Sequence, residues 1–93
     1  MMQWQLRIYR AKEGGLEPFI AEWRTNLLPL RRAMGFEVLG PWVTDDGRLV
    51  WIIGHEDLHE ADKAYYASPE RAAVEPDPAR HLADAQHIDM SER

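Results

Sequence analysis

The sequence lacks cysteine, a strongly basic region and any long hydrophobic run. Without cysteine the chain has neither disulfides nor thiol catalysis. The formal net charge of −5, with its few basic residues scattered, argues against a nucleic-acid-binding surface, which needs clustered Lys and Arg. The longest apolar run, residues 49–53, is strand-sized and too short to cross a membrane, and the N-terminus does not resemble a signal peptide. We therefore expect a cytoplasmic protein that binds neither nucleic acid nor membranes.

The sequence has enough apolar residues to form one small core. Its 93 residues are 45% hydrophobic and include four Trp, whose large side chains dominate cores and interfaces. There is no linker, repeat or low-complexity tract, so residues 1–93 are predicted to form a single domain. A domain of this size gains much stability when a partner chain covers one of its faces.

The first strand is predicted by strict alternation at the start of the chain. Trp4, Leu6 and Ile8 fall on one side, and Arg7 and Tyr9 fall on the other. We assign Trp4, like Trp23 further along, to the hydrophobic core.

A helix is predicted from about residue 16 to residue 34. Its apolar residues recur at steps of three and four, which gives one stripe: Leu16, Phe19, Ile20, Trp23, Leu27, Leu30 and Met34. Pro29 falls inside this pattern and predicts a kink near residues 26–28, because proline lacks the N–H that a helix interior uses. Gly35 is the predicted C-cap.

The rest of the chain predicts two strands, a helix and a final strand. Residues 36–44 form a strand that Gly40-Pro41 interrupts, which requires a bulge or an edge position. A turn at 45–47 leads to the strand 49–53, which is apolar on both faces and is therefore expected to be covered on both sides. Asp57 has the capping-box spacing to Glu60 and opens a helix, and Ser68 restarts a short helical turn. Residues 82–90 alternate and form the last strand.

This order, β-α-β-β-α-β, predicts an α+β fold of the ferredoxin-like type. The fold has a four-stranded antiparallel sheet with both helices on one face and the first and third strands at its centre. On this view Arg7 and Tyr9 point to the sheet face without helices. That face also carries apolar residues, so we expect a second copy to pack against it, sheet to sheet, and to enclose a cavity.

Three segments carry a resemblance to a known family. They are QLRIYRAKEG (5–14), PLRRAMGFEVLGPW (29–42) and YYASPERAAVEPDP (65–78), and they resemble the NIPSNAP family of the dimeric α+β barrel superfamily. The resemblance implies a ferredoxin-like protomer and a homodimer. It implies no particular reaction, since related barrels include cofactor-free monooxygenases, isomerases and haem-degrading or peroxidase-type enzymes. Glu13 stands where the family usually has Pro.

Arg7 and Tyr9 are the first candidate site residues. A guanidinium and a phenol in an enclosed cavity could hold a carboxylate or enolate and supply a proton. The alternative is a structural ion pair, for which Asp89 on the last strand is the expected partner. Trp42 and Trp51 could line an aromatic ligand pocket, or serve only as core or interface residues.

The histidines offer weaker candidates. His87 could act as a general base, or as a haem ligand of the kind this superfamily uses, whereas His59 and His81 are expected to face solvent. HEDLH at 55–59 matches the zinc-protease motif H-E-x-x-H, but with Asp57 as N-cap His55 lies outside the helix, so we predict no metal site. Of Tyr65 and Tyr66, one is expected to pack on the sheet and the other to cover the rim of the dimer.

Two functions remain open from the sequence. One is a homodimeric binding module whose cavity holds a small organic molecule. The other is a cofactor-free monooxygenase- or isomerase-like enzyme that acts through Arg7, Tyr9 and His87. The second requires an Arg7 that is not neutralised and a cavity of roughly 300 Å³ or more. No cofactor is expected for either function, since the glycine-rich nucleotide motifs are absent.

Overall fold

The strands and helices follow the predicted order. The computed structural model describes all 93 residues. Its elements are β1 (Gln3–Ala11), α1 (Leu16–Glu22), the π-helix η1 (Trp23–Leu27), α2 (Leu28–Ala33), β2 (Glu37–Val43), β3 (Leu49–His55), α3 (Leu58–Ala67), α4 (Pro69–Ala72), the 3₁₀-helix η2 (Pro78–His81) and β4 (Leu82–Met90).

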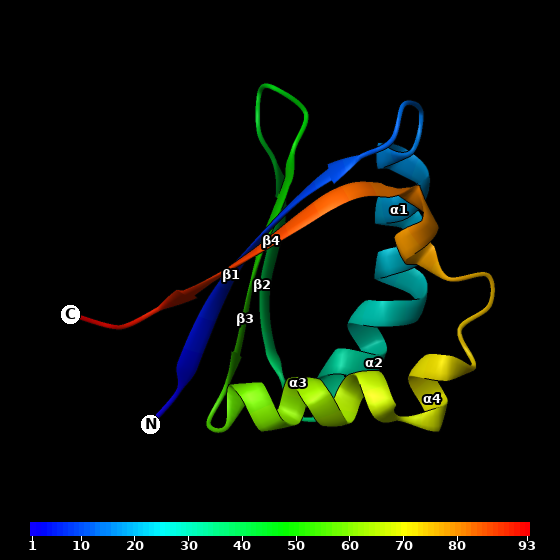
Figure 1. Ribbon diagram of the computed structural model, residues 1–93. Coiled ribbons are helices and arrows are strands. Elements are labelled where there is room, and N and C mark those ends of the chain that lie inside the picture. Colours follow the sequence, from blue (N-terminus) through cyan, green and yellow to red (C-terminus); the bar gives the residue numbers. More distant parts are fainter.

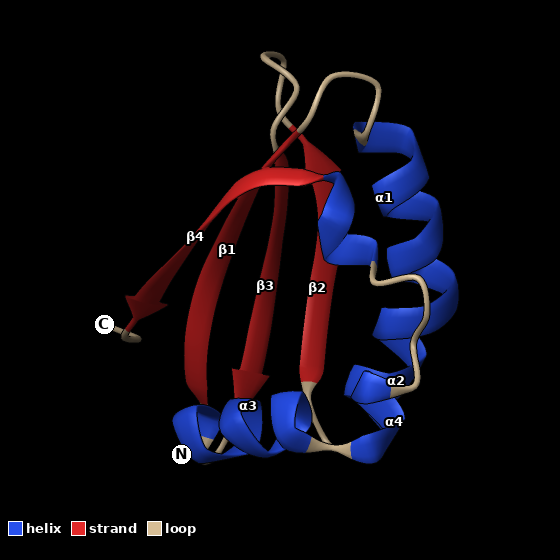
Figure 2. Cartoon of the chain, turned by 45° about the vertical axis from the view of Figure 1, so that its right-hand side comes forward, coloured by secondary structure: helices blue, strands red, loops and turns tan.

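The four strands form one antiparallel sheet in the order β2-β3-β1-β4 (Figure 2). The central positions of β1 and β3 are confirmed. All the helices lie on one side of the sheet, so that the other side carries none (Figure 1). This arrangement confirms the predicted ferredoxin-like α+β fold.

The covered face is closed by the predicted apolar stripe of the first helical region. Phe19, Trp23 and Leu27 are buried, and the remaining members of the stripe pack against the same core. The helix is irregular where Pro29 predicts a kink, because residues Trp23–Leu27 adopt the wider π-helical turn. Proline has no N–H and its ring crowds the carbonyl four residues earlier, so the regular hydrogen-bond ladder cannot continue through it.

Strand β2 meets both conditions that Gly40-Pro41 imposes. It is an edge strand, and Leu39 pairs with Ile52 while Trp42 pairs with Val50. Three steps along β2 therefore match two along β3, which is a β-bulge at the proline.

The caps of the later helices are only partly as predicted. The side chain of Ser68 accepts a hydrogen bond from the N–H of Arg71, as a cap of α4. The side chain of Asp57 makes no capping bond, and the prediction of a capping box is wrong. Instead, the N–H of Leu58 donates to Oε1 of Gln3 on β1, at 2.9 Å. A residue distant in sequence has taken the capping role, which local spacing could not indicate.

The two faces of β1 are the reverse of the prediction. Gln5, Arg7 and Tyr9 lie on the helix-covered face and are 6%, 0% and 6% exposed. Leu6 and Ile8 are only half-buried, on the helix-free face. The prediction that Arg7 and Tyr9 face the helix-free side is therefore wrong, because the helices bring polar partners that satisfy these side chains beneath them.

The tryptophans divide between the two faces. Trp23 is 1% exposed and belongs to the core, as predicted. Trp4 lies on the helix-free face, so its assignment to the core is corrected. Its ring covers Gly54 on the neighbouring strand, where an added Cβ would lie only 2.5 Å from the ring.

None of the helices could cross a lipid bilayer, since none combines the length and the apolar character that this requires.

Candidate functional site

Arg7 is the centre of a buried hydrogen-bond network. Its Nε donates to Gln5 Oε1 at 2.8 Å and its Nη2 donates to Asp62 Oδ2 at 3.0 Å. Its Nη1 lies 3.4 Å from the hydroxyl of Tyr9 and 3.3 Å from that of Tyr66. With all three nitrogens engaged and no exposed surface, Arg7 is fully paired.

A second arginine, Arg31 of α2, enters the same network. Its Nη1 donates to Asp62 Oδ1 at 2.6 Å, and its Nη2 lies 3.3 Å from the Tyr66 hydroxyl. Its guanidinium carbon sits 3.6 Å from the centre of the Tyr65 ring and 4.8 Å from that of Phe36. Cation–π contacts of this kind hold a guanidinium that has lost most of its water.

One carboxylate therefore serves two buried guanidiniums. Asp62 on α3 bridges Arg7 and Arg31, one oxygen to each. The expected pairing of Arg7 with Asp89 is wrong: Asp89 accepts a hydrogen bond from Gln5 Nε2 at 2.9 Å instead. With two cations and one anion, the network carries a surplus positive charge.

A cavity of about 220 Å³ lies beside this network, between the sheet and the helices of the single chain. Aromatic and aliphatic side chains form most of its wall, with arginine, tyrosine and histidine among them. The lining residues are Tyr9, Phe19, Trp23, Leu27, Arg31, Trp51, Tyr65, Tyr66, Arg71, Ala79, Leu82, Ala85 and His87.

Three of the predicted site residues meet at this cavity. Tyr9, Trp51 and His87 line it, whereas Arg7 is not among the lining residues. Trp42 is 53% exposed, on the helix-free face, and the prediction that it shares a pocket with Trp51 is wrong. This cavity lies within the single chain, on the helix-covered side of the sheet, whereas the cavity expected between two copies stays a prediction.

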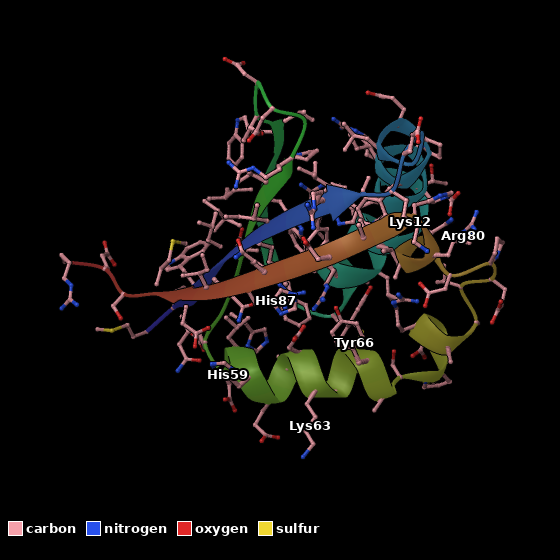
Figure 3. All side chains as sticks on the ribbon, turned by 45° about the horizontal axis from the view of Figure 1, so that its top comes forward. Lys12, His59, Lys63, Tyr66, Arg80 and His87 are labelled. Carbon is pink, nitrogen blue, oxygen red and sulfur yellow. The ribbon has the colours of Figure 1, made fainter.

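His87 and Tyr66 come to the cavity from opposite sides. His87 is on β4, the edge strand, and Tyr66 is on α3, which runs below that strand in Figure 3. Both are exposed, whereas Tyr65 is 1% exposed and packs on the sheet side. Lys63, from the same helix, points away from the strand (Figure 3). The cavity is therefore lined from both β4 and α3.

The phenol of Tyr9 and the imidazole of His87, both at the cavity, are held in their neutral forms. Burial raises the pKa of the Tyr9 phenol, and the Arg7 charge offsets only part of this effect. Although His87 keeps exposed surface, its dense surroundings desolvate the imidazolium and lower its pKa, and the Arg7 charge lowers it further. Burial lowers the pKa of Arg7, but Tyr9, Tyr66 and Asp62 outweigh that effect and raise it overall, so Arg7 stays charged. A neutral imidazole and a neutral phenol therefore share the cavity, their ring centres 6.3 Å apart.

Two donors at the cavity have no partner in the protein. They are the indole Nε1 of Trp51 and the Nε of Arg71, and both are buried. An unmade hydrogen bond at a buried donor costs about 1–3 kcal/mol. Both side chains are among the lining residues of the cavity.

The histidines of HEDLH do not converge. His55 ends β3, where its Nδ1 accepts from the N–H of Asp57 at 2.9 Å. His59 lies in α3, with Nε2 at 3.3 Å from Asp89 Oδ2. The prediction that His55 falls outside the helix is confirmed, and nowhere do three His, Asp or Glu side chains gather as metal ligands. His81 is not solvent-facing as expected, since it is half-buried and lies 2.9 Å from Glu22.

Sequence reasoning missed Arg31, Asp62 and Arg71. A signal existed for the first two. Arg31 stands four residues after Leu27, in the apolar stripe, and Asp62 stands four after Leu58, on the inward face of α3. A charged residue at a buried helical position indicates a partner inside the fold. No comparable pattern marks Arg71, which the short helix α4 brings to the cavity.

With the fold and the cavity established, the chain can be compared with known proteins. Residues 4–90 match the protein-family model described as NIPSNAP. The chain belongs to the NIPSNAP family. This confirms the resemblance seen in the three sequence segments. No curated protein matches the chain.

Solved structures of NIPSNAP proteins share the fold over the full chain. An uncharacterized NIPSNAP domain protein from Burkholderia xenovorans has a TM-score of 0.84 at 18% identity, covering 100% of this chain and 95% of its own. A NIPSNAP family protein from Agrobacterium tumefaciens has a TM-score of 0.84 at 18% identity, and the match covers 100% of this chain and 94% of that protein. A putative antibiotic biosynthesis monooxygenase from Nitrosomonas europaea has a TM-score of 0.75 at 15% identity, and the match covers 98% of this chain and 89% of that protein. At these identities the likeness establishes the fold.

Proposed function

We propose that this NIPSNAP protein is a homodimeric binding module. Each protomer binds a small organic molecule in the cavity between its sheet and its helices. The observation that carries the proposal is the cavity of about 220 Å³, which combines apolar walls with converging polar groups. Binding sites generally have this composition. A cytoplasmic location stays a prediction.

The dimer follows from the helix-free face of the sheet. Leu39, Trp42, Ile88 and Met90 are 46%, 53%, 44% and 36% exposed, and the register places them around half-buried Leu6. Stable monomers rarely expose a continuous apolar surface of this kind. A second copy, packed sheet to sheet through a two-fold axis, would cover both surfaces at once.

A cofactor-free enzyme is the second candidate. One observation favours it, namely that a neutral His87 and a neutral Tyr9 face the same cavity, as an acid–base pair requires. The Nitrosomonas europaea neighbour is titled a putative antibiotic biosynthesis monooxygenase, which fits this candidate. One observation weighs against it: Arg7 is fully paired inside the protein.

Binding can be tested with three small naphthalene derivatives: 1-naphthoate, 1-naphthalenemethanol and 1-naphthylmethylammonium. Tryptophan fluorescence and calorimetry should detect at least one of them binding at about one molecule per chain, because Trp23 and Trp51 line the cavity. Ala85→Trp, which fills the cavity from β4, should abolish this binding. Ala83→Trp is the matched control, on the same strand but outside the lining residues, and should leave binding intact. If none of the three binds, or if Ala85→Trp has no effect, the proposed cavity is not a binding site.

A further inference from the structure

The charged residues at the cavity have only one sign. The chain as a whole is acidic, with 16 Asp and Glu against 11 Lys and Arg. Among the lining residues, however, Arg31 and Arg71 are the only Lys, Arg, Asp or Glu. Their acidic partners, Asp62 and Asp77, are not among the lining residues. In a chain of net charge −5, a cavity that presents arginine and no carboxylate is a specific feature.

The positive charge at the cavity is not fully balanced. Asp62 is shared by Arg7 and Arg31, so one of the two buried guanidiniums lacks a counter-charge of its own. Buried charges require pairing, because their loss of water is otherwise uncompensated. An anion in the cavity, next to Arg31, would supply the missing charge.

The hydrogen-bonding groups of the wall are mostly donors. Trp51 and Arg71 each have one unused N–H. The hydroxyl oxygens of Tyr9 and Tyr66 accept from arginine, so their own protons remain to be donated. The imidazole of His87 can also accept a hydrogen bond while it is neutral. A ligand rich in acceptors, and not in donors, fits this wall.

The remaining wall is apolar and largely aromatic. Phe19, Trp23 and Leu27 come from the helices, and Leu82 comes from the start of β4. Such a wall suits a flat hydrocarbon body. The positive charge, the hydrogen-bond donors and the apolar surface of the cavity together indicate one chemical class of ligand.

We propose that the cavity selects an apolar, preferably aromatic, molecule that carries a single negatively charged oxygen group, as an aryl carboxylate or a phenolate does. The anionic oxygens take hydrogen bonds from Arg71 and Arg31 and the ring lies against Trp23 and Phe19. This assignment rests on the proposed binding function and adds the charge of the ligand to it.

The same three probes test the charge preference. Because hydrogen bonds to a charged group are stronger than those to a neutral one, 1-naphthoate should bind at least about tenfold more tightly than 1-naphthalenemethanol. The cation 1-naphthylmethylammonium should bind more weakly than either. If the alcohol or the cation matches the carboxylate, the cavity binds small molecules but does not select anions, and the inference fails while the binding function stands.

Arg71→Met identifies the group responsible. Arg71 is a suitable target because its partner Asp77 is 56% exposed and can be hydrated when left alone. The variant should lose about tenfold in affinity for 1-naphthoate and keep its affinity for the alcohol within about twofold. Arg80→Met removes the same charge from η2, outside the lining residues, and should change neither. If Arg71→Met and Arg80→Met lose affinity for 1-naphthoate equally, only the overall charge of the protein affects binding, and the assignment of Arg71 is overturned. Thermal melts of both variants establish that they are folded.

Discussion

Each face of the sheet carries some residues of the kind usually found on the other face. The helix-covered face buries Gln5, Arg7 and Tyr9, which are polar, whereas the helix-free face leaves Leu39 and Trp42, which are apolar, about half exposed. In most small proteins, an antiparallel sheet covered on one side shows the reverse pattern. Here the polar residues are inside because α2 and α3 bring charged and aromatic partners to them.

Polarity alone therefore does not identify the buried face of a strand. A buried polar residue is stable when every hydrogen bond is made, and Arg7 meets this condition through four partners. An exposed apolar face is stable when another surface covers it. The covered face is thus completed within one chain, and we propose that the helix-free face is completed by a second.

The largest effect should follow from breaking the covered face at Arg7. Arg7→Met keeps the aliphatic bulk but leaves Gln5 Oε1 and the Tyr9 hydroxyl without a donor, and should cost about 3 kcal/mol or more in the free energy of unfolding. Arg10→Met is the matched control from the same strand, since its exposed pair with Asp84 should contribute less than about 1 kcal/mol. Urea denaturation measures both.

Because Asp62 pairs with both Arg7 and Arg31, a double variant gives a further test of the network. A simple ion pair would recover stability when both partners are removed, as double-mutant cycles show. Removing Arg7 and Asp62 together instead leaves Arg31 buried without a counter-charge, so the double variant should recover little. Substantial recovery would mean that Arg31 does not depend on Asp62.

The next largest effect concerns the helix-free face. Light scattering at micromolar concentration should give about twice the chain mass of 10.8 kDa. Trp42→Glu places a charge in each half of the proposed interface and should weaken the dimer about a hundredfold or more, which sedimentation at decreasing concentration measures. Asn26→Glu adds the same charge to an exposed residue of η1 and should not alter assembly. A wild-type protein that is monomeric at micromolar concentration would contradict the proposed dimer.

The fold was predictable because its signals are local and periodic. The stripe from Leu16 to Met34, the strand at 82–90 and the interruption at Gly40-Pro41 each depend on spacing within one segment. Their order along the chain then limits the topology to very few arrangements.

The site was predictable only in part, because its partners are distant in sequence. Tyr9, Trp51 and His87 were recognised as single residues. The pairing of Arg7 with Asp62 joins β1 to α3, 55 residues apart, and no periodicity specifies it. The alternation of β1 fixed which residues share a face, but choosing the covered face required knowing that Arg31 and Asp62 also point inward.

A smaller effect should follow at Gln3, which by alternation lies on the covered side of β1 and caps α3. Gln3→Ala removes the acceptor of the Leu58 N–H and should cost about 1 kcal/mol, as for other helix N-caps. Gln86→Ala, on the helix-free side of β4, should change stability by less than about 0.5 kcal/mol. Asp57→Ala, at the position where sequence spacing predicts the cap, should also have a small effect, since its side chain makes no capping bond. If Asp57→Ala lowers the free energy of unfolding more than Gln3→Ala does, Asp57 and not Gln3 is the cap of α3.

The smallest effect concerns His87, the register neighbour of Arg7 on β4. Its pKa is lowered in the folded protein, by desolvation first and then by the charge of Arg7, with Arg31 acting in the same direction and Asp62 and Asp89 opposing. As the pH falls below the ordinary pKa of histidine, His87 is protonated in the unfolded chain but is still neutral in the folded chain. Folding stability contributed by neutral His87 is therefore present above that value and is lost on acidification. Between about pH 7.5 and about pH 5.5 the wild-type protein should lose more stability than His87→Gln, which has no such proton. All other titratable groups are present in both proteins, so the difference between the two curves of stability against pH isolates His87. If the two proteins lose stability equally over this pH range, His87 on the edge strand β4 is fully hydrated, and neither burial nor Arg7 lowers its pKa.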